Sequence, residues 1–238
     1  MKKRRIVLTT AALVIVIGAM AAYGVWRVIS NAPDEVSLDA AVASLETSEV
    51  VGQDLSTEGT WVIDTDSGSF TFEEASGSFV GFRIKEELAR IGKITAVGRT
   101  GEVDGELRIG AGELQSVFVS ADLSTLITND SRRDRAARNA LNVSENPIAS
   151  FSMDKPVALS ATDGSAVSLK VKGELLINGI GREAEFDLQA QLVGETVVVV
   201  GSTEVVFADY DVEVPSAVIV VSAEDHGVVE FQLLFVRP

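Results

Sequence analysis

Four arginines lie within seven positions of the segment TNDSRRDRAARNAL, residues 128–141. The chain of 238 residues is otherwise acidic, with 35 acidic and 20 basic residues and a formal net charge of -15. A guanidinium binds a phosphate or a carboxylate through two parallel hydrogen bonds. The segment could therefore meet the anionic headgroup of a ligand, or pair with carboxylates of the protein itself. The arginines are Arg132, Arg133, Arg135 and Arg138.

The residue types on which most catalytic and metal sites depend are nearly absent. The chain has no cysteine and a single histidine, His226, which excludes thiolate chemistry and zinc sites built from Cys and His. No nucleophile-elbow pattern occurs. Asp64 and Asp66 could form an acid–base pair or bind a cation, but their neighbours Ser67 and Gly68 favour a turn. We therefore expect no catalytic residue, metal ligand or cofactor.

The N-terminus has the pattern of a membrane segment. Basic residues at positions 2–5 precede an uncharged run over residues 6–26, which as a helix spans roughly 31 Å, the thickness of a bilayer core. Residues 1–29 are therefore predicted to be a cytoplasmic stub and transmembrane anchor. The alternative is a cleaved signal peptide, since Ala19 and Ala21 flank Met20 in a small-x-small pattern. The apolar run continues past that point, which favours the anchor.

The charge distribution predicts where the rest of the chain lies. Positive residues stay on the cytoplasmic side, so the remainder is expected outside the membrane, or secreted or periplasmic if the segment is cleaved. Residues 1–30 contain five basic and no acidic residues, which leaves 15 basic and 35 acidic residues, a net charge of -20. Such a surface repels nucleic acid, so we expect no polynucleotide partner.

Two regions follow the membrane segment. Residues 30–58 are rich in Ala, Ser, Thr and Glu, with one brief apolar periodicity in LDAAVASL. They are predicted to be a polar tether with a helical turn or two, reaching about 30 Å if flexible. Residues 59–238 are predicted to be a single domain.

Alternation of apolar and polar residues dominates that domain. AEFDLQAQL and LKVKGELLI place apolar side chains on one face and polar ones on the other, as half-buried antiparallel strands do. Asn178-Gly179 between them is a favoured two-residue hairpin turn. Many such strands at short spacing predict an all-β barrel or sandwich. KEELARIG (85–92) and NDSRRDRAARNAL (129–141) are predicted to be short helices.

Two segments are apolar on both faces, so their facing is not assigned. They are QSVFVSADL, within residues 114–123, and TVVVVGSTEVVF, residues 196–207.

Four motifs in order resemble the YceI-like family of polyisoprenoid-binding proteins: GTWVIDTDSGSFTF, TAVGRTGEVDGELRI, VFVSADLSTLITNDSRRDRAARNALNVSENPIASFSM and VKGELLINGIGREAEFDLQA. The resemblance covers nearly all of residues 59–238. It implies an extended, lipocalin-like antiparallel barrel of eight strands, an isoprenoid lipid in the apolar interior, export and no catalysis. Members commonly have a cleaved signal, so the predicted anchor is a departure.

Filled and hollow barrels show the same alternation, and only the resemblance implies a hollow one. The two hypotheses are therefore a lipid-binding barrel and a filled barrel that binds a protein partner, which the sequence does not identify. From strand parity, the residues predicted to line a lipid tunnel are Phe70, Phe72, Val80, Phe82, Phe151, Met153, Leu175, Ile177, Phe186, Leu188, Phe231 and Leu233.

The resemblance also concerns the arginines. In the family an Arg-Asp dipeptide and its helix follow the strand that reads here SVFVSADL, and Arg133-Asp134 corresponds to this dipeptide. The resemblance makes Arg132 and Arg133 candidates to meet a pyrophosphate or other polar headgroup at the mouth of the barrel. The alternative is pairing with Asp130, Asp134 and Glu145, which docks the helix. We favour this structural role, because an acidic protein offers many carboxylates and an apolar tunnel needs no charge to bind hydrocarbon.

Overall fold

Every strand pairing in the described part of the chain is antiparallel, and the strands form one sheet. The computed structural model describes residues 32–45, 56–68, 70, 76–88, 92–213 and 220–238. Its elements are α2 (Leu38–Leu45), β1 (Gly59–Ile63), β2 (Phe79–Leu88), β3 (Gly92–Thr100), β4 (Val103–Gly110), β5 (Glu113–Asp122), η1 (Leu123–Thr125), β6 (Ile127–Thr128), α3 (Ser131–Ala140), β7 (Ile148–Met153), β8 (Val157–Ala158), β9 (Val167–Ile177), β10 (Ile180–Val193), β11 (Thr196–Val206), η2 (Phe207–Tyr210), β12 (Val220–Ala223) and β13 (His226–Val236).

Eight of these strands close into a barrel, in the order β1-β4-β5-β7-β9-β10-β11-β13. The ring closes where β1 pairs with β13, at Val62 with Val236 and Ile63 with Phe235. The strands β2, β3 and β6 continue the sheet outward from β13. The prediction of an antiparallel barrel of about eight strands is confirmed. Closure pairs the strand edges that would otherwise be exposed.

The β9–β10 hairpin forms where the sequence predicts it. Asn178 and Gly179 have φ values of 52° and 73°, and the flanking residues Ile177 and Ile180 pair. Two consecutive positive φ values are typical of the turn whose twist matches that of the adjoining strands. The buried Phe186 and Leu188 alternate with exposed residues along β10, as the period of two requires.

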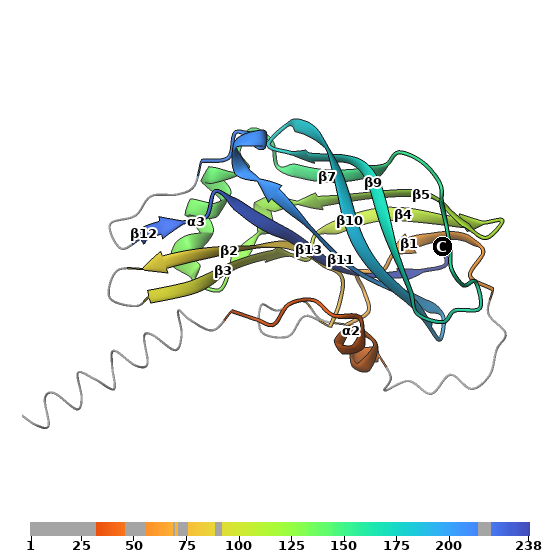
Figure 1. Cartoon of the computed structure of the whole chain (residues 1–238). Helices are drawn as coiled ribbons and strands as arrows, with labels where there is room; N and C mark the ends of the chain where they lie inside the picture. Colours follow the sequence, from red (N-terminus) through yellow and green to blue (C-terminus); the bar gives the residue numbers. More distant parts are fainter. Residues whose placement is uncertain (1–31, 46–55, 69, 71–75, 89–91, 214–219) are drawn as a thin grey trace, which may run out of the picture.

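One predicted helix is wrong and one is confirmed. Residues 85–88 belong to β2, which pairs with β3 from Val80 with Thr100 to Leu88 with Gly92. Lys85, Glu86 and Glu87 have good helix propensity, but pairing of this part of β2 with β3 on one edge and β12 on the other outweighs that local preference. The segment with the four arginines does form a helix, α3 (Figure 1).

Residues 32–45, which we call the strap, lie along the outside of the barrel (Figure 1). They fall within the segment predicted to be a tether. In α2, Leu38 and Ala41 are buried against Val198, Val200 and Leu234 on the outer face of β11 and β13. This contact explains why β11 is apolar on both faces, since its other face points into the barrel.

A buried ion cluster joins the strap to the barrel. Glu230 on β13 accepts hydrogen bonds from Nε of Arg83 at 2.6 Å and Nη2 of Arg99 at 2.7 Å. The side chains of Arg83, Arg99 and Glu230 are 10%, 4% and 2% exposed. The carbonyl of Pro33 accepts from Arg83 at 2.7 Å, and the carbonyl of Asp34 accepts from both arginines. Two guanidinium groups have more N–H donors than the carboxylate of Glu230 can accept. The carbonyls of the strap accept hydrogen bonds from the remaining donors.

The predicted membrane segment, residues 6–26, lies outside the described residues. Within the described part of the chain, no helix is both long and apolar enough to cross a bilayer.

Candidate functional site

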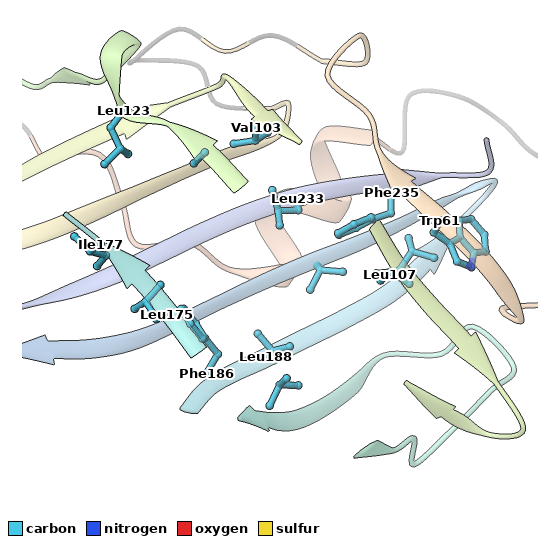
Figure 2. Close-up of a cluster of buried hydrophobic side chains, with 14 of the residues drawn as sticks. Trp61, Val103, Leu107, Leu123, Leu175, Ile177, Phe186, Leu188, Leu233 and Phe235 are labelled. Atoms are coloured by element: carbon cyan, nitrogen blue, oxygen red, sulfur yellow. The ribbon is translucent and has the colours of Figure 1, made fainter. Parts of the chain in front are cut away.

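A cavity of about 180 Å³ occupies the interior of the barrel. Side chains from most strands of the ring surround it, together with Val80 and Phe82 from β2. Trp61, Leu107 and Phe235 pack with the same interior cluster as Phe186 and Leu188 (Figure 2). The interior is therefore apolar and is not completely filled by side chains.

Nine of the twelve residues predicted to line a tunnel lie on the cavity wall. Phe186 is central among them: its ring centroid is 4.9 Å from that of Phe151 and 5.6 Å from that of Phe231. A Cβ atom on Gly173 would lie 2.7 Å from Cζ of Phe151, so the glycine leaves room for this ring. The nine residues are Val80, Phe82, Phe151, Leu175, Ile177, Phe186, Leu188, Phe231 and Leu233.

The other three predicted residues do not line the cavity in the described structure. The ring of Phe70 lies 6.0 Å from that of Phe79, so Phe70 packs against a neighbouring aromatic ring away from the cavity wall. It forms an isolated bridge, not part of a regular strand, so strand parity does not apply to it. Met153 packs against the core cluster but does not reach the wall. Phe72 lies outside the described residues.

Sequence reasoning missed the wall formed by β4 and β5. Leu107 and Ile109 line the cavity from β4, where the alternation in GELRI was the available signal. Val117 and Val119 line it from β5, while Phe118 points outward and is 45% exposed. This exposed phenylalanine made the facing of β5 ambiguous.

The two ends of the cavity differ. At one end the wall consists of Leu123, Leu126, Ile177 and Leu141, which are buried or half-buried, and α3 lies at this end of the barrel (Figure 1). At the opposite end the wall includes the exposed Ser165. The cavity therefore reaches the surface at this second end. We call this end the mouth; its lining residues are Thr57, Ala161, Gly164, Ser165 and Gln191.

Two arginines of α3, Arg133 and Arg138, bond to other groups of the protein, whereas Arg135 is exposed. Arg133 donates from Nη2 to Oε2 of Glu86 at 3.0 Å and from Nη1 to Oδ1 of Asn129 at 3.0 Å. Arg138 donates to the carbonyl of Leu126 at 2.6 Å. Neither arginine lines the cavity. Arg133 thus pairs with Glu86 on β2, which was not among the carboxylates named from the sequence.

The position of α3 follows from these bonds. Oδ1 of Asp134 accepts from the amide and the hydroxyl of Thr128, each at 2.8 Å. Together with the bonds of Arg133 and Arg138, they hold the helix on β2 and β6. The side chain of Arg132 is outside the described part of the structure.

Asp64 forms a turn, as its neighbours predict. Its Oδ1 accepts from the amides of Asp66 at 2.8 Å and Ser67 at 3.1 Å. In the described part of the chain, no group of three or more His, Cys, Asp or Glu residues is placed to hold a metal ion.

His226 lies at the start of β13 and provides a test of surface electrostatics. Its hydrogen bond with Asp225, at 2.9 Å, raises the pKa above the ordinary value of 6.5, and the charges of Glu204 and Glu224 act in the same direction. Because the folded-state pKa is the higher one, this interaction stabilises the fold below pH 6.5. The contribution disappears as the pH rises through the folded-state pKa.

An NMR titration of the imidazole is therefore expected to give a pKa above 6.5. The Asp225→Asn variant should shift it back toward 6.5, because the hydrogen bond to a carboxylate is lost. A wild-type pKa at or below 6.5 would contradict this geometry.

Residues 61–235 match the model of the YceI-like domain. The chain belongs to the YceI-like family. A similar solved structure is the polyisoprenoid-binding domain from Saccharophagus degradans implicated in plant cell wall breakdown. It is 16% identical, with a TM-score of 0.54, over 76% of this chain and 100% of that one.

A second similar structure is BcnA from Burkholderia cenocepacia. It is 14% identical, with a TM-score of 0.51, over 72% of this chain and 98% of that one. At these identities the likeness shows that the YceI-like barrel is shared. No curated protein matches the sequence.

Proposed function

We propose that the barrel binds an isoprenoid-type lipid in its interior and does not catalyse a reaction on it. The observation that carries the proposal is the apolar cavity, which reaches the surface at one end and is walled by buried side chains at the other. Membership of the YceI-like family and the likeness to a polyisoprenoid-binding domain support it. A filled barrel that serves only as an interaction module would have no such space.

The energetics of this interior favour hydrocarbon. Each buried methylene contributes roughly 0.8 kcal/mol, so a five-carbon isoprene unit contributes on the order of 3–4 kcal/mol before the costs of ordering. The cavity of about 180 Å³ is similar in size to a core cavity of about 150 Å³ that binds benzene. It accommodates a short, branched stretch of chain. A longer chain requires the rings of Phe151, Phe186 and Phe231 to move apart.

The cellular position remains part of the proposal. We infer that the barrel lies outside the cell membrane, held there by residues 6–26, or is released if that segment is cleaved. The uncharged run and the basic residues before it support this placement.

Mass spectrometry of lipids that copurify with the protein tests the function. The full chain is purified in a nonionic detergent, and a chloroform–methanol extract is compared with one from the Ala190→Trp variant, whose cavity is filled. A prenyl lipid is expected in the wild-type extract at up to one molecule per barrel, and it should be depleted in the variant. Identical extracts would contradict the proposal, because lipid carried along by detergent does not depend on the cavity.

A further inference from the structure

We propose that this cavity prefers isoprenoid lipids whose polar end is uncharged, such as an alcohol or a carbonyl, over the corresponding prenyl phosphates. The inference rests on the proposed function and names the class of lipid that the same site takes.

The cavity wall offers no counterion to a phosphate. Among the described residues that line it, none is Lys, Arg, His, Asp or Glu. A phosphate drawn into this space would lose its hydration without gaining a cation, and such burial is strongly unfavourable. The charged end of a prenyl phosphate must therefore stay at or beyond the mouth.

Hydroxyl groups and carboxylates lie next to the lining residues of the mouth. The hydroxyl of Thr57 donates to the carbonyl of Thr162 at 3.1 Å, and the hydroxyl of Ser165 donates to Oδ1 of Asp163 at 2.7 Å. Asp163 is exposed and directly precedes the lining residue Gly164, while Glu58 directly follows Thr57. A neutral headgroup can exchange hydrogen bonds with these hydroxyls, whereas an anion lies close to like charge.

The carboxylate of Asp163 is held in its ionised form. Hydrogen bonds from the hydroxyl and the amide of Ser165 lower the pKa of Asp163 below its ordinary value of 3.8. The negative charge at the mouth is therefore present throughout the physiological pH range.

Two arginines near the ends of the barrel, Arg237 and Arg133, already have acceptors. Close to the mouth, Nη2 of Arg237 donates to the carbonyl of Ser56 at 2.6 Å and of Glu58 at 3.1 Å, and its guanidinium lies over the ring of Trp61. At the α3 end, Arg133 pairs with Glu86. A phosphate at Arg237 or Arg133 would have to compete with these contacts, and the exposed Arg135 does not line the cavity.

A competition experiment on the full chain tests the preference. A diazirine derivative of geranylgeraniol is cross-linked to the protein in nonionic micelles, with unlabelled geranylgeraniol or geranylgeranyl phosphate as the competitor. We expect the alcohol to compete at a concentration at least tenfold lower than the phosphate. Cross-linked peptides should come from the cavity wall.

The alcohol and the phosphate partition unequally into micelles, but this partitioning is the same for every protein variant. A change in the concentration ratio between variants therefore reports on the mouth. Asp163→Asn should lower the phosphate-to-alcohol concentration ratio at least threefold. Asp187→Asn, which removes an exposed carboxylate from the outside of β10, is the matched control and should leave the ratio unchanged. Arg133→Met should also leave it unchanged, because Arg133 binds no headgroup in this arrangement.

Each outcome decides a different point. Equal or better competition by the phosphate, or a phosphate affinity that depends on Arg133, would overturn the preference and leave lipid binding intact. An unchanged ratio in Asp163→Asn would overturn the part assigned to the mouth. No competition by either compound, and no cross-link to the cavity wall, would overturn the proposed function itself.

Discussion

Replacing Ala190 with tryptophan is expected to weaken lipid binding at least tenfold, equivalent to about 1.4 kcal/mol or more of binding free energy. Ala190 lies on the cavity wall, on β10 opposite Val199 of β11. An indole placed there occupies much of a space of about 180 Å³. Overpacking should lower the free energy of unfolding by only about 1–3 kcal/mol, so the variant should remain folded.

The measurement is displacement of a cross-linkable prenyl probe, with circular dichroism to verify the fold. Gln189→Trp is the matched control, because Gln189 is the neighbouring residue on β10 and is exposed on the outside of the barrel. Ala190→Phe fills less of the cavity and should give an intermediate affinity. Equal affinities in the wild type and Ala190→Trp would show that the lipid binds elsewhere.

Replacing Glu230 with alanine is expected to lower the free energy of unfolding by about 3–5 kcal/mol, because it leaves buried charges without their partner. Glu230 is 1% exposed and bonds to both Arg83 and Arg99. Only the carbonyls of the strap, together with the ring of Phe79 under Arg99, then remain as contacts of these guanidinium groups among those described here. Urea unfolding followed by tryptophan fluorescence measures the change.

Glu185→Ala provides the comparison. Glu185 pairs with Lys170 and Lys172, but both lysines are more than half exposed, so the loss of stability should be much smaller than in Glu230→Ala. Replacing Arg83, Arg99 and Glu230 together by methionine should restore much of the stability, since no buried charge is left unpaired. A loss in Glu230→Ala as small as that in Glu185→Ala would show that the cluster is hydrated.

The strands that the sequence predicts well are those with one face in the cavity and one in water. β9 and β10 are examples: Val171 and Phe186 are buried, while Lys170, Lys172 and Asp187 on the opposite face are exposed. The alternation of apolar and polar residues is visible only where the outer face of the strand is exposed to solvent. The turn between the two strands is predictable for a different reason, because the residue types Asn178 and Gly179 alone favour it.

Prediction failed where another element covers the outside. On β11, Val197 and Val199 face the interior while Val198 and Val200 pack under α2, so no alternation remains. β2 has charged residues near its end that suggest a helix, and only the pairing of this end with β3 and β12 makes it a strand. Both cases depend on contacts between distant parts of the chain, which local patterns do not contain.

Many of the residues that line the cavity could be predicted from the sequence, but the existence of the cavity could not. Parity identified inward residues such as Phe186 and Leu188, and these line the cavity. Whether their side chains meet at the centre depends on barrel geometry and rotamers. The headgroup candidate Arg133 shows the same limit, because its partner Glu86 lies 47 positions away in the sequence.

The difference between the two ends of the cavity fixes the order of events in lipid exchange. In the proposed complex, a lipid that uses the mouth enters tail first and leaves with its polar end first, because α3 lies at the other end of the barrel. In this arrangement a donor or acceptor of the lipid approaches the Thr57 side of the barrel and meets the polar group before any hydrocarbon.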